Sequence, residues 1–465
     1  MALKPALEKR LAEFGQQDLL AFWDELSEAE RRGLAEQIAQ VDFSTIADLT
    51  KRQQQAADFA ALAARAETPQ AFRLGASDNQ FTPAQAREAG AAALARGEVG
   101  AILVAGGQGT RLGFPHPKGM FAIGPVSRAP LFQVLFEKLL AIGRRHKTRL
   151  PLYLMTSPAT HAETVAYLGE KQRFGLAADD VHFFSQAQMP AVEIGTGRLL
   201  LEDKARLALS PDGHGGMLAA LAKSGGLADM ARRGLRRLFY FQVDNPLTTV
   251  CDAEFIGYHM LARSEMTLQV VAKRYPLERV GNVVSVDGRL QIIEYSDLPE
   301  SVAVLKNPDG SLRFWAGSIA VHLFDLAFLE RMQHDAGGLP FHIARKKVAH
   351  IDSAGNRIEP QSPNAIKFER FIFDLLPHAA RSTIVEIDPA IGFAPVKNAP
   401  GEKQDTAATA QAALIALHTG WLREAGAVVA AGTPVEISPL FALDATDLAG
   451  KLAPGLPVTQ PTCFS

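Results

Sequence analysis

The chain has 465 residues, of which 47% are hydrophobic and 21% charged, a composition that predicts a folded protein with more than one core. The formal net charge of -2 gives no reason to expect nucleic acid or an acidic membrane as a partner. Two cysteines are too few for a disulfide framework. The sequence has no run of about 18 apolar residues, so it predicts no membrane span. The first residues lack a signal-peptide core, and we therefore expect a cytoplasmic protein.

The first part of the chain is predicted to be helical. Between positions 19 and 26, apolar residues recur with helical spacing. Ser27 followed by Glu30 has the spacing of a capping box, so a helix should begin there. Two Ala-rich helices should follow, at 56–66 and 84–95. We therefore expect a helical N-terminal domain over residues 1–95.

The pattern changes near residue 98 to short apolar runs typical of buried strands. These runs lie at 99–104, 150–155, 181–184, 238–243 and 267–272. Helical patterns between them, at 131–145 and 160–171, predict an α/β domain with a mostly parallel sheet. Asp287-Gly288 predicts a hairpin between 282–286 and 290–295.

The sequence pattern changes again in the last part of the chain. From about residue 396 it is an Ala-rich helical stretch, followed by apolar pieces punctuated by Pro and Gly. We expect a small C-terminal domain with short strands over 396–465, and a central domain over 96–395.

The most informative segment is a glycine loop directly after the first predicted strand. Residues 103–113 read LVAGGQGTRLG, and Pro117-Lys118-Gly119 follows. Glycines after a buried strand let the backbone N–H groups approach a phosphate or a base edge. Arg111 and Lys118 add positive charge, with Arg suited to bidentate phosphate contact. The combination favours a nucleotide site over a ligand-free turn.

Two commoner glycine motifs do not fit. The dinucleotide fingerprint requires G-x-G-x-x-G, whereas Gly107, Gly109 and Gly113 have one residue too many in the second gap. A Walker loop ends in Lys followed by Ser or Thr, whereas Lys118 precedes Gly119.

The loop resembles the G-G-x-G-T-R-L-G…P-K signature of the UDP-sugar pyrophosphorylases. Six more short motifs follow in that family's order, at 211–216, 243–245, 278–281, 293–296, 366–369 and 395–398. The chain is most similar to the eukaryotic-type UDP-N-acetylglucosamine pyrophosphorylase branch. The resemblance implies a GT-A-like, Rossmann-like nucleotide-binding domain with smaller flanking domains. It also implies UTP and a sugar 1-phosphate as substrates and Mg²⁺ as cofactor.

The implied reaction requires cations and a metal-binding carboxylate, because a phosphate oxygen attacks the α-phosphorus of UTP and no protein nucleophile is needed. Asp244 follows the run 238–243, at the sheet edge where α/β proteins bind ligands; it either binds Mg²⁺ or caps the turn before Pro246. The resemblance makes Arg111, Lys118 and Lys397 catalytic and Lys367 a nucleotide ligand. Lys367 and Lys397 have apolar neighbours, which is unusual for purely solvated lysines.

The resemblance also nominates residues for the two substrates. For the nucleotide it implies, besides Asp244 and Lys367, Ala105, Gly106, Gly107, Gln186, Gly213 and His214. For the sugar it implies Gly281, Glu294, Tyr295, Ser318, Phe371 and Phe373. Without the resemblance, the two phenylalanines would be read as core aromatics, the hairpin as a half-exposed ribbon and His214 as a surface residue. His214 and Ser318 stand where the N-acetylglucosamine branch usually has Asn, so glucose or galactose 1-phosphate remains the alternative substrate.

Two other classes of protein compete with this interpretation. A GT-A glycosyltransferase that consumes UDP-sugar usually carries Asp-x-Asp, whereas this strand ends Val243-Asp244-Asn245. A non-catalytic nucleotide-sugar sensor should have lost Arg111, Lys118 or Asp244, and all three are present. We expect no nucleic-acid or membrane partner, and a monomer or weak homo-oligomer.

Overall fold

The computed structural model describes residues 3–52, 59–334 and 338–465. The chain forms two compact units, each built from several segments. The smaller unit comprises residues 1–58, 186–217 and 337–374, and the larger unit comprises 59–185, 218–336 and 375–465. These units do not follow the expected linear division at residues 95 and 395. Within the described residues, no helix is long and apolar enough to cross a membrane.

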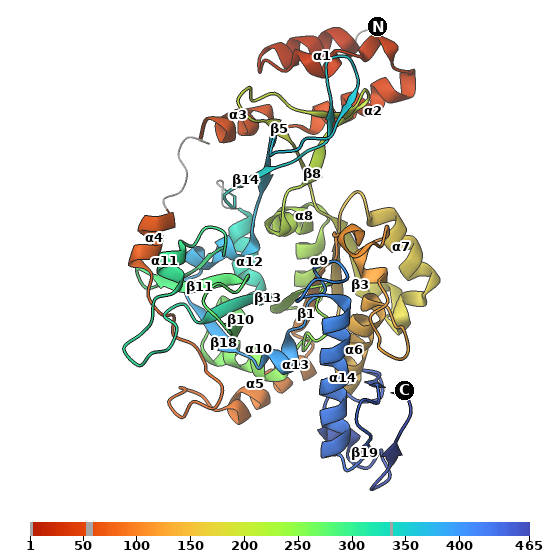
Figure 1. Cartoon of the computed structure of the whole chain (residues 1–465), viewed down its shortest axis with the longest axis vertical. Helices are drawn as coiled ribbons and strands as arrows, with labels where there is room; N and C mark the ends of the chain where they lie inside the picture. Colours follow the sequence, from red (N-terminus) through yellow and green to blue (C-terminus); the bar gives the residue numbers. More distant parts are fainter. Residues whose placement is uncertain (1–2, 53–58, 335–337) are drawn as a thin grey trace. The chain divides into compact units, whose positions relative to one another are not determined.

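A nine-stranded sheet forms the centre of the larger unit (Figure 1). Its strands are β1 (Val99–Val104), β2 (Leu152–Thr156), β3 (Val181–Ser185), β9 (Arg237–Gln242), β10 (Met266–Ala272), β11 (Gly281–Val286), β12 (Arg289–Ile293), β13 (Ala316–Asp325) and β18 (Ser382–Glu386). The order is β12-β11-β13-β9-β1-β2-β3, and β10 pairs with β13 and β18. β9, β1, β2 and β3 run parallel, which confirms the expected α/β fold. β13 runs antiparallel to β9, β10 and β11, so the other half of the sheet is mixed.

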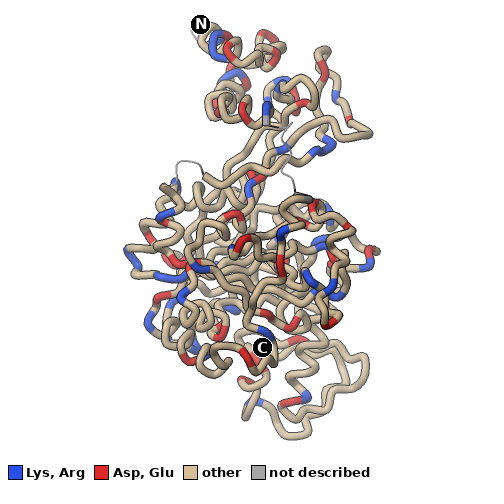
Figure 2. Tube along the Cα trace, turned by 90° about the vertical axis from the view of Figure 1, so that its left-hand side faces the viewer, with Lys and Arg blue, Asp and Glu red and all other residues tan. Residues whose placement is uncertain are grey.

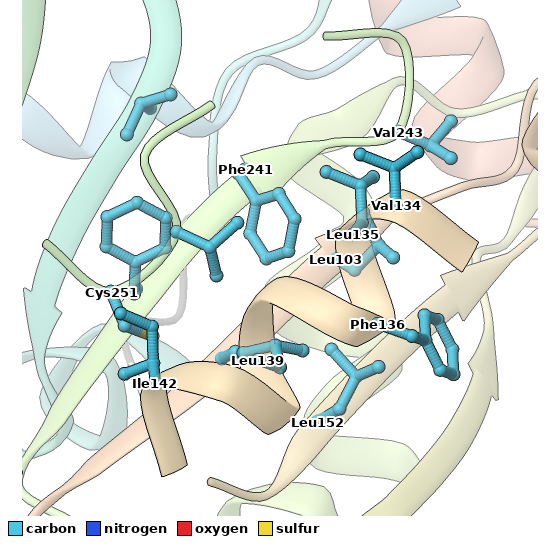
Figure 3. Packing of buried hydrophobic residues seen from close by; sticks show 14 of the residues in the cluster. Leu103, Val134, Leu135, Phe136, Leu139, Ile142, Leu152, Phe241, Val243 and Cys251 are labelled. Atoms are coloured by element: carbon cyan, nitrogen blue, oxygen red, sulfur yellow. The ribbon is translucent and has the colours of Figure 1, made fainter. Parts of the chain in front are cut away.

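Helices of the larger unit cover both faces of this sheet. They are α4 (Phe59–Arg65), α5 (Pro83–Ala95), α6 (Leu131–His146), α7 (His161–Glu170), α8 (Met217–Lys223), α9 (Gly226–Arg232), α10 (Ala253–Leu261), α11 (Glu300–Ala303), α12 (Leu326–Gln333), α13 (Pro389–Gly392) and α14 (Ala407–Glu424). Because side chains alternate along a strand, Leu103 and Phe241 lie on the same face, where they pack against Leu135 and Leu139 of α6 (Figure 3). On the other face, the hydroxyl of Tyr153 donates to Asp229 of α9 at 2.7 Å.

The expected C-terminal strands are present and belong to the larger unit. They are β19 (Val428–Val429), β20 (Val435–Ile437), β21 (Pro457–Val458) and β22 (Thr462–Phe464). A separate cluster of buried side chains, including Leu422, Val435 and Leu448, fills the space under them.

The smaller unit joins the N-terminal helices to strands from two later segments. Its helices are α1 (Leu3–Ala12), α2 (Glu28–Gln40) and α3 (Phe43–Arg52). Its strands are β4 (Gln188–Pro190), β5 (Val192–Glu193), β6 (Leu201–Asp203), β7 (Arg206–Leu207), β8 (Leu209–Pro211), β14 (His342–Lys346), β15 (His350–Ile351), β16 (Arg357–Ile358) and β17 (Ala365–Glu369). β17 pairs with β5, and Leu34 and Ile38 share a core with Phe368. This long-range packing is why the helical segment does not form a domain by itself.

The local predictions for the N-terminal segment are partly confirmed. Ser27 and Glu30 form the expected capping box at the start of α2. The stretch with helical spacing before it forms two 3-10 helices, η1 (Gln17–Leu20) and η2 (Trp23–Glu25), in place of a longer α-helix. The Ala-rich stretch at 56–66 corresponds to α4, and its first residues lie outside the described part of the chain. Figure 2 shows Lys and Arg interspersed with Asp and Glu along the trace of each unit, in keeping with the net charge near zero.

Candidate functional site

The glycine loop after β1 is closed by its own backbone. The amide of Lys118 donates to the carbonyl of Gly107 at 3.0 Å, and the amide of Gly109 donates to the carbonyl of His116 at 2.9 Å. A Cβ atom at Gly109 would lie 2.7 Å from the carbonyl oxygen of Phe114, so the loop requires glycine there. The closure places Lys118 beside Gly107, although eleven positions separate them in the sequence.

Three cations and one carboxylate meet at the carboxyl ends of β1 and β9. Burial lowers the pKa of Lys118, the carboxylate of Asp244 opposes this effect, and the charges of Lys397 and Arg111 lower the pKa further. Asp244, Lys397 and Arg111 therefore each lie within electrostatic reach of Lys118. Arg111 and Lys397 are exposed, and Lys118 and Asp244 are half-buried. The predicted catalytic residues Arg111, Lys118 and Lys397 are thus brought together with the predicted metal ligand.

Asn245, which the sequence analysis did not select as a site residue, fixes the segment that carries Lys397. Its side chain is buried; Nδ2 donates to the carbonyl of Gly392 at 2.8 Å, and Oδ1 accepts from the amide of Ala394 at 3.1 Å. The amide of Val396 donates to the carbonyl of Asp244 at 2.8 Å. Asn245 was within reach of sequence reasoning, because it belongs to the run Val243-Asp244-Asn245.

Asp405 is a second acidic residue near this cluster that the sequence analysis missed. Its backbone carbonyl accepts from the amides of Lys397 and Asn398 at 2.7 and 2.9 Å. Burial raises the pKa of the Asp405 carboxyl, an effect that Lys397 and Arg274 oppose and Asp244 reinforces. No local motif marks Asp405, because only the folded chain brings it near Asp244.

The first residues of the glycine loop are held against the neighbouring strand. The amide of Ala105 donates to the carbonyl of Met155 at 2.8 Å, and the hydroxyl of Ser157 donates to the carbonyl of Gly106 at 2.8 Å. The predicted nucleotide residues Ala105, Gly106 and Gly107 therefore form a fixed edge next to the charged cluster.

Three of the predicted sugar residues come together on adjacent strands of the larger unit. Gly281 pairs with Ser318 across β11 and β13. A Cβ atom at Gly281 would lie 2.9 Å from Cγ2 of Ile292, 3.3 Å from Oε1 of Glu294 and 3.7 Å from Cβ of Ser318, so these side chains pack closely around the glycine. Tyr295 follows on the chain and is 49% exposed.

A buried lysine that was not predicted as a site residue binds the start of β11, next to Gly281. Lys273 donates from Nζ to Oδ1 of Asn282 at 2.6 Å and to the carbonyl of Pro276 at 2.9 Å. Burial lowers its pKa to about 8, and Glu278 opposes this shift. Lys273 thereby ties the strand that begins at Gly281 to the preceding loop.

The remaining predicted residues belong to the smaller unit. Gly213 has φ +84°, and a Cβ atom there would lie 2.3 Å from the carbonyl oxygen of Arg370, so this position requires glycine. Nδ1 of His214 accepts from the amide of Ile372 at 3.2 Å, which leaves the proton of the neutral ring on Nε2. The rings of Phe371 and Phe373 stack at 5.0 Å, and His214 packs against both at 5.3 and 5.8 Å.

The glycine turn of the smaller unit also contains a buried acid that the sequence analysis did not name. Asp212 is 3% exposed, and burial raises its pKa to about 6 against the opposing charge of Arg370. Gln186, predicted for the uracil, is buried and is the first residue of the 186–217 segment of the same unit. Lys367 lies on β17, and burial lowers its pKa while Glu369 opposes the shift.

The residues at this site fit a Mg²⁺ ion that is bound partly by substrate phosphates better than a metal ion that is bound by protein side chains alone. Among the described residues, no group of three His, Cys, Asp or Glu side chains is arranged to hold a metal ion. Asp244 makes no hydrogen bond or ion pair with another described side chain, so its oxygens are available. Mg²⁺ is commonly bound through one or two carboxylates, water and substrate phosphates, and Asp244 beside a phosphate-binding loop matches that pattern.

Comparison with known proteins gives the family. Residues 67–438 match the family described as UTP–glucose-1-phosphate uridylyltransferase (UDPGP). The chain belongs to this family. All the residues named above as candidate site residues, from Ala105 to Asp405, fall inside the matched region.

Individual members of the family resemble the chain over most of its length. It is 38% identical over 356 residues to the UDP-N-acetylglucosamine pyrophosphorylase of Saccharomyces cerevisiae, covering 75% of each chain. It is 37% identical to UDP-N-acetylhexosamine pyrophosphorylase-like protein 1 of Xenopus tropicalis, covering 90% of this chain and 84% of the relative. The structure of the Trypanosoma brucei uridine diphosphate N-acetylglucosamine pyrophosphorylase, in complex with an inhibitor, matches with a TM-score of 0.83 and 27% identity over 99% of each chain.

Proposed function

We propose that this uridylyltransferase-family protein joins UTP and N-acetylglucosamine 1-phosphate into UDP-N-acetylglucosamine and releases pyrophosphate. The observation that carries the proposal is the meeting of Lys118, Arg111 and Lys397 with Asp244 beside the glycine loop. Relatives named for this activity are 33–38% identical to the chain over most of its length.

The reaction is an in-line displacement at phosphorus, and the cluster suits it. A phosphate oxygen of the sugar 1-phosphate attacks the α-phosphorus of UTP. The bond from that phosphorus to the bridging oxygen breaks, and the electron pair leaves with pyrophosphate. Negative charge on the transferred group and the leaving group must be neutralised, and Arg111, Lys118 and Lys397 carry the charges for this task. The backbone N–H groups of the glycine loop orient the nucleotide.

We propose that Asp244 holds a Mg²⁺ ion together with phosphate oxygens of UTP. When bound, the ion neutralises phosphate charge and orients the triphosphate. The protein contributes a fixed carboxylate, because Asp244 is anchored through its own backbone carbonyl to Val396 and through its neighbour Asn245 to Gly392.

The base and the sugar are assigned to separate groups of residues. For uridine we propose Ala105, Gly106, Gly107, Gln186, Gly213, His214 and Lys367. For the sugar we propose Gly281, Glu294, Tyr295, Ser318, Phe371 and Phe373. A second candidate substrate is glucose 1-phosphate, because Ser318, which pairs with Gly281, has a shorter reach than the Asn usual in the N-acetylglucosamine branch.

We also propose that the protein acts in the cytoplasm. Cys251 is a buried free thiol and Cys463 a half-buried one, which suits a reducing compartment.

The function is tested by measuring pyrophosphate release from UTP with Mg²⁺ and a panel of sugar 1-phosphates. We expect release with N-acetylglucosamine 1-phosphate and a smaller rate with glucose 1-phosphate, with UDP-sugar formed in equal amount. ATP, GTP and dTTP should serve poorly, because a site that hydrogen-bonds the uracil edge leaves polar groups unpaired against another base. Pyrophosphate release that does not depend on any sugar 1-phosphate, or equal rates with ATP, would contradict the proposal.

A further inference from the structure

A cavity of about 590 Å³ lies in the larger unit, away from the glycine loop. Its walls come from α6 and α14, which Figure 1 shows in the larger unit, and from the 247–252 segment and the segment around β20. Most wall residues are apolar, among them Val134, Ile142, Leu247, Leu414, Leu417 and Trp421. The volume is within the range of about 300–1,000 Å³ found for small-molecule sites.

Most charged side chains at the wall already have partners of opposite charge or backbone donors. Arg145 pairs with Asp444 at 2.8 Å, and Arg87 pairs with Glu254 at 3.4 Å. Asp252 accepts from two backbone amides at the start of α10, and Glu436 accepts from the amides of residues 126 and 127. Glu424 is exposed to solvent at the end of α14.

Lys138 is the exception. Nζ donates to the carbonyls of Pro246 and Thr248 at 2.6 and 2.9 Å, and among the described residues no carboxylate lies within ion-pair distance of it. Thr248 also lines the cavity, so the ammonium is at the cavity wall. His418, another titratable group at this wall, is buried, and its Nδ1 accepts from the amide of Ile437. Among the described residues at the wall, Lys138 is therefore a cation with backbone acceptors but without a carboxylate partner.

We propose that this cavity is a binding site for a small organic acid with an aromatic or aliphatic body, whose carboxylate pairs with Lys138. The apolar walls take the body of the ligand, and the carboxylate takes the third N–H of the ammonium, which the two carbonyls do not use. Burial lowers the pKa of Lys138 to about 7, because desolvation disfavours the charged ammonium. A bound carboxylate supplies a counter-charge.

The site has a direct connection to the charged cluster described above. Lys138 holds the carbonyls of Pro246 and Thr248, and Pro246 is two positions from Asp244. Ile391, at the cavity wall, is in α13 next to Gly392, which Asn245 holds. An occupant of the cavity therefore touches both segments that position Asp244 and Lys397, and we expect it to change kcat.

The binding claim is tested by calorimetric titration of the full chain with 2-naphthoate and with the neutral, equally sized 2-naphthamide. We expect one naphthoate per chain and at least tenfold weaker binding of the amide. Ala445→Trp fills the cavity from a half-exposed wall position and should abolish naphthoate binding without lowering the unfolding temperature. Lys138→Met should remove the preference for the acid over the amide.

Three results would overturn the proposal. They are no naphthoate binding to the wild type, equal binding of acid and amide, and naphthoate binding that survives in Ala445→Trp. The comparison of acid with amide needs only the wild type, so the test does not depend on the folding of Lys138→Met. Each arm measures binding directly and is independent of the reaction that the protein catalyses.

Discussion

The backbone carbonyl of Asp244 accepts a hydrogen bond of 2.8 Å from the amide of Val396. This contact joins the end of β9 to a segment that is distant in the sequence, and Lys397 is the next residue of that segment. We propose that residues from three separate segments act on one phosphate chain, and the following predictions test this proposal.

Arg111→Ala and Lys118→Ala should each lower kcat strongly. Loss of one charge contact to the transition state costs about 3–4 kcal/mol, or about 10²–10³ in rate. The measurement is kcat at saturating UTP, with the fold checked by circular dichroism. Arg96→Ala, an exposed cation at the far end of β1, is the matched control and should leave kcat unchanged. A loss below threefold in either site variant removes that residue from the catalytic set.

Asp244→Asn keeps the size of the side chain but removes its charge, and it should nearly abolish product formation. It should also raise the Mg²⁺ concentration needed for half-maximal activity of the residual enzyme, because the ion loses an anionic ligand. The experiment is a Mg²⁺ titration of the wild type and the variant. Asp287→Asn, in the exposed hairpin turn, serves as the control. Full wild-type activity in excess chelator would refute the metal proposal.

Asn245→Ala should lower kcat by up to about 10²-fold. Without the Asn245 contacts the segment that carries Lys397 shifts, and displacing its charge from the substrate lowers the rate as much as displacing the substrate itself. The substitution should also lower the free energy of unfolding by about 1–3 kcal/mol, since the backbone groups of Gly392 and Ala394 lose their partner. The two effects are measured by steady-state kinetics and urea denaturation. If stability falls while kcat stays within twofold of the wild type, Asn245 has only a structural role.

Ser318→Asn should increase the preference for N-acetylglucosamine 1-phosphate over glucose 1-phosphate. An amide both donates to and accepts from an acetamido group, and one such hydrogen bond is worth about 0.5–1.5 kcal/mol, or up to about tenfold. The ratio of kcat/KM for the two sugars is the measurement, and Ser318→Ala is the control for loss of the hydroxyl alone. An unchanged ratio in Ser318→Asn would show that another residue discriminates between the sugars.

His418 should make the protein less stable in acid. Burial, reinforced by Lys138, lowers its pKa from 6.5 to about 3, so the ring is neutral in the folded state. The unfolded chain therefore binds more protons between these two values, and stability decreases as the pH falls below 6.5. From pH 6.5 to 5.0 this amounts to about 2 kcal/mol.

The acid effect is measured by urea denaturation at pH 7.5 and 5.0 in the wild type and in His418→Asn. The Asn oxygen can replace Nδ1 as the acceptor for the amide of Ile437 but does not titrate. We expect the variant to lose less stability than the wild type on acidification. Equal losses in the two proteins would assign the acid sensitivity to other groups.

Much of the larger unit could be predicted from the sequence because its signals are local. The run 99–104, the glycine loop and the hairpin at Asp287-Gly288 are encoded by neighbouring residues, and the structure has β1, the loop and the β11–β12 pair at those positions. Asp244 was identifiable because it directly follows a buried strand, and parallel strands present their carboxyl ends at one edge.

Only the tertiary structure decided which distant segments meet. The pairing of β5 with β17 and the Asn245 contacts to Gly392 and Ala394 join residues far apart in the chain. Helical and strand periodicity arises from interactions within a few residues and is therefore visible in the sequence. Contacts between distant segments depend on how all the apolar faces are buried at once, and no single stretch of sequence encodes that result.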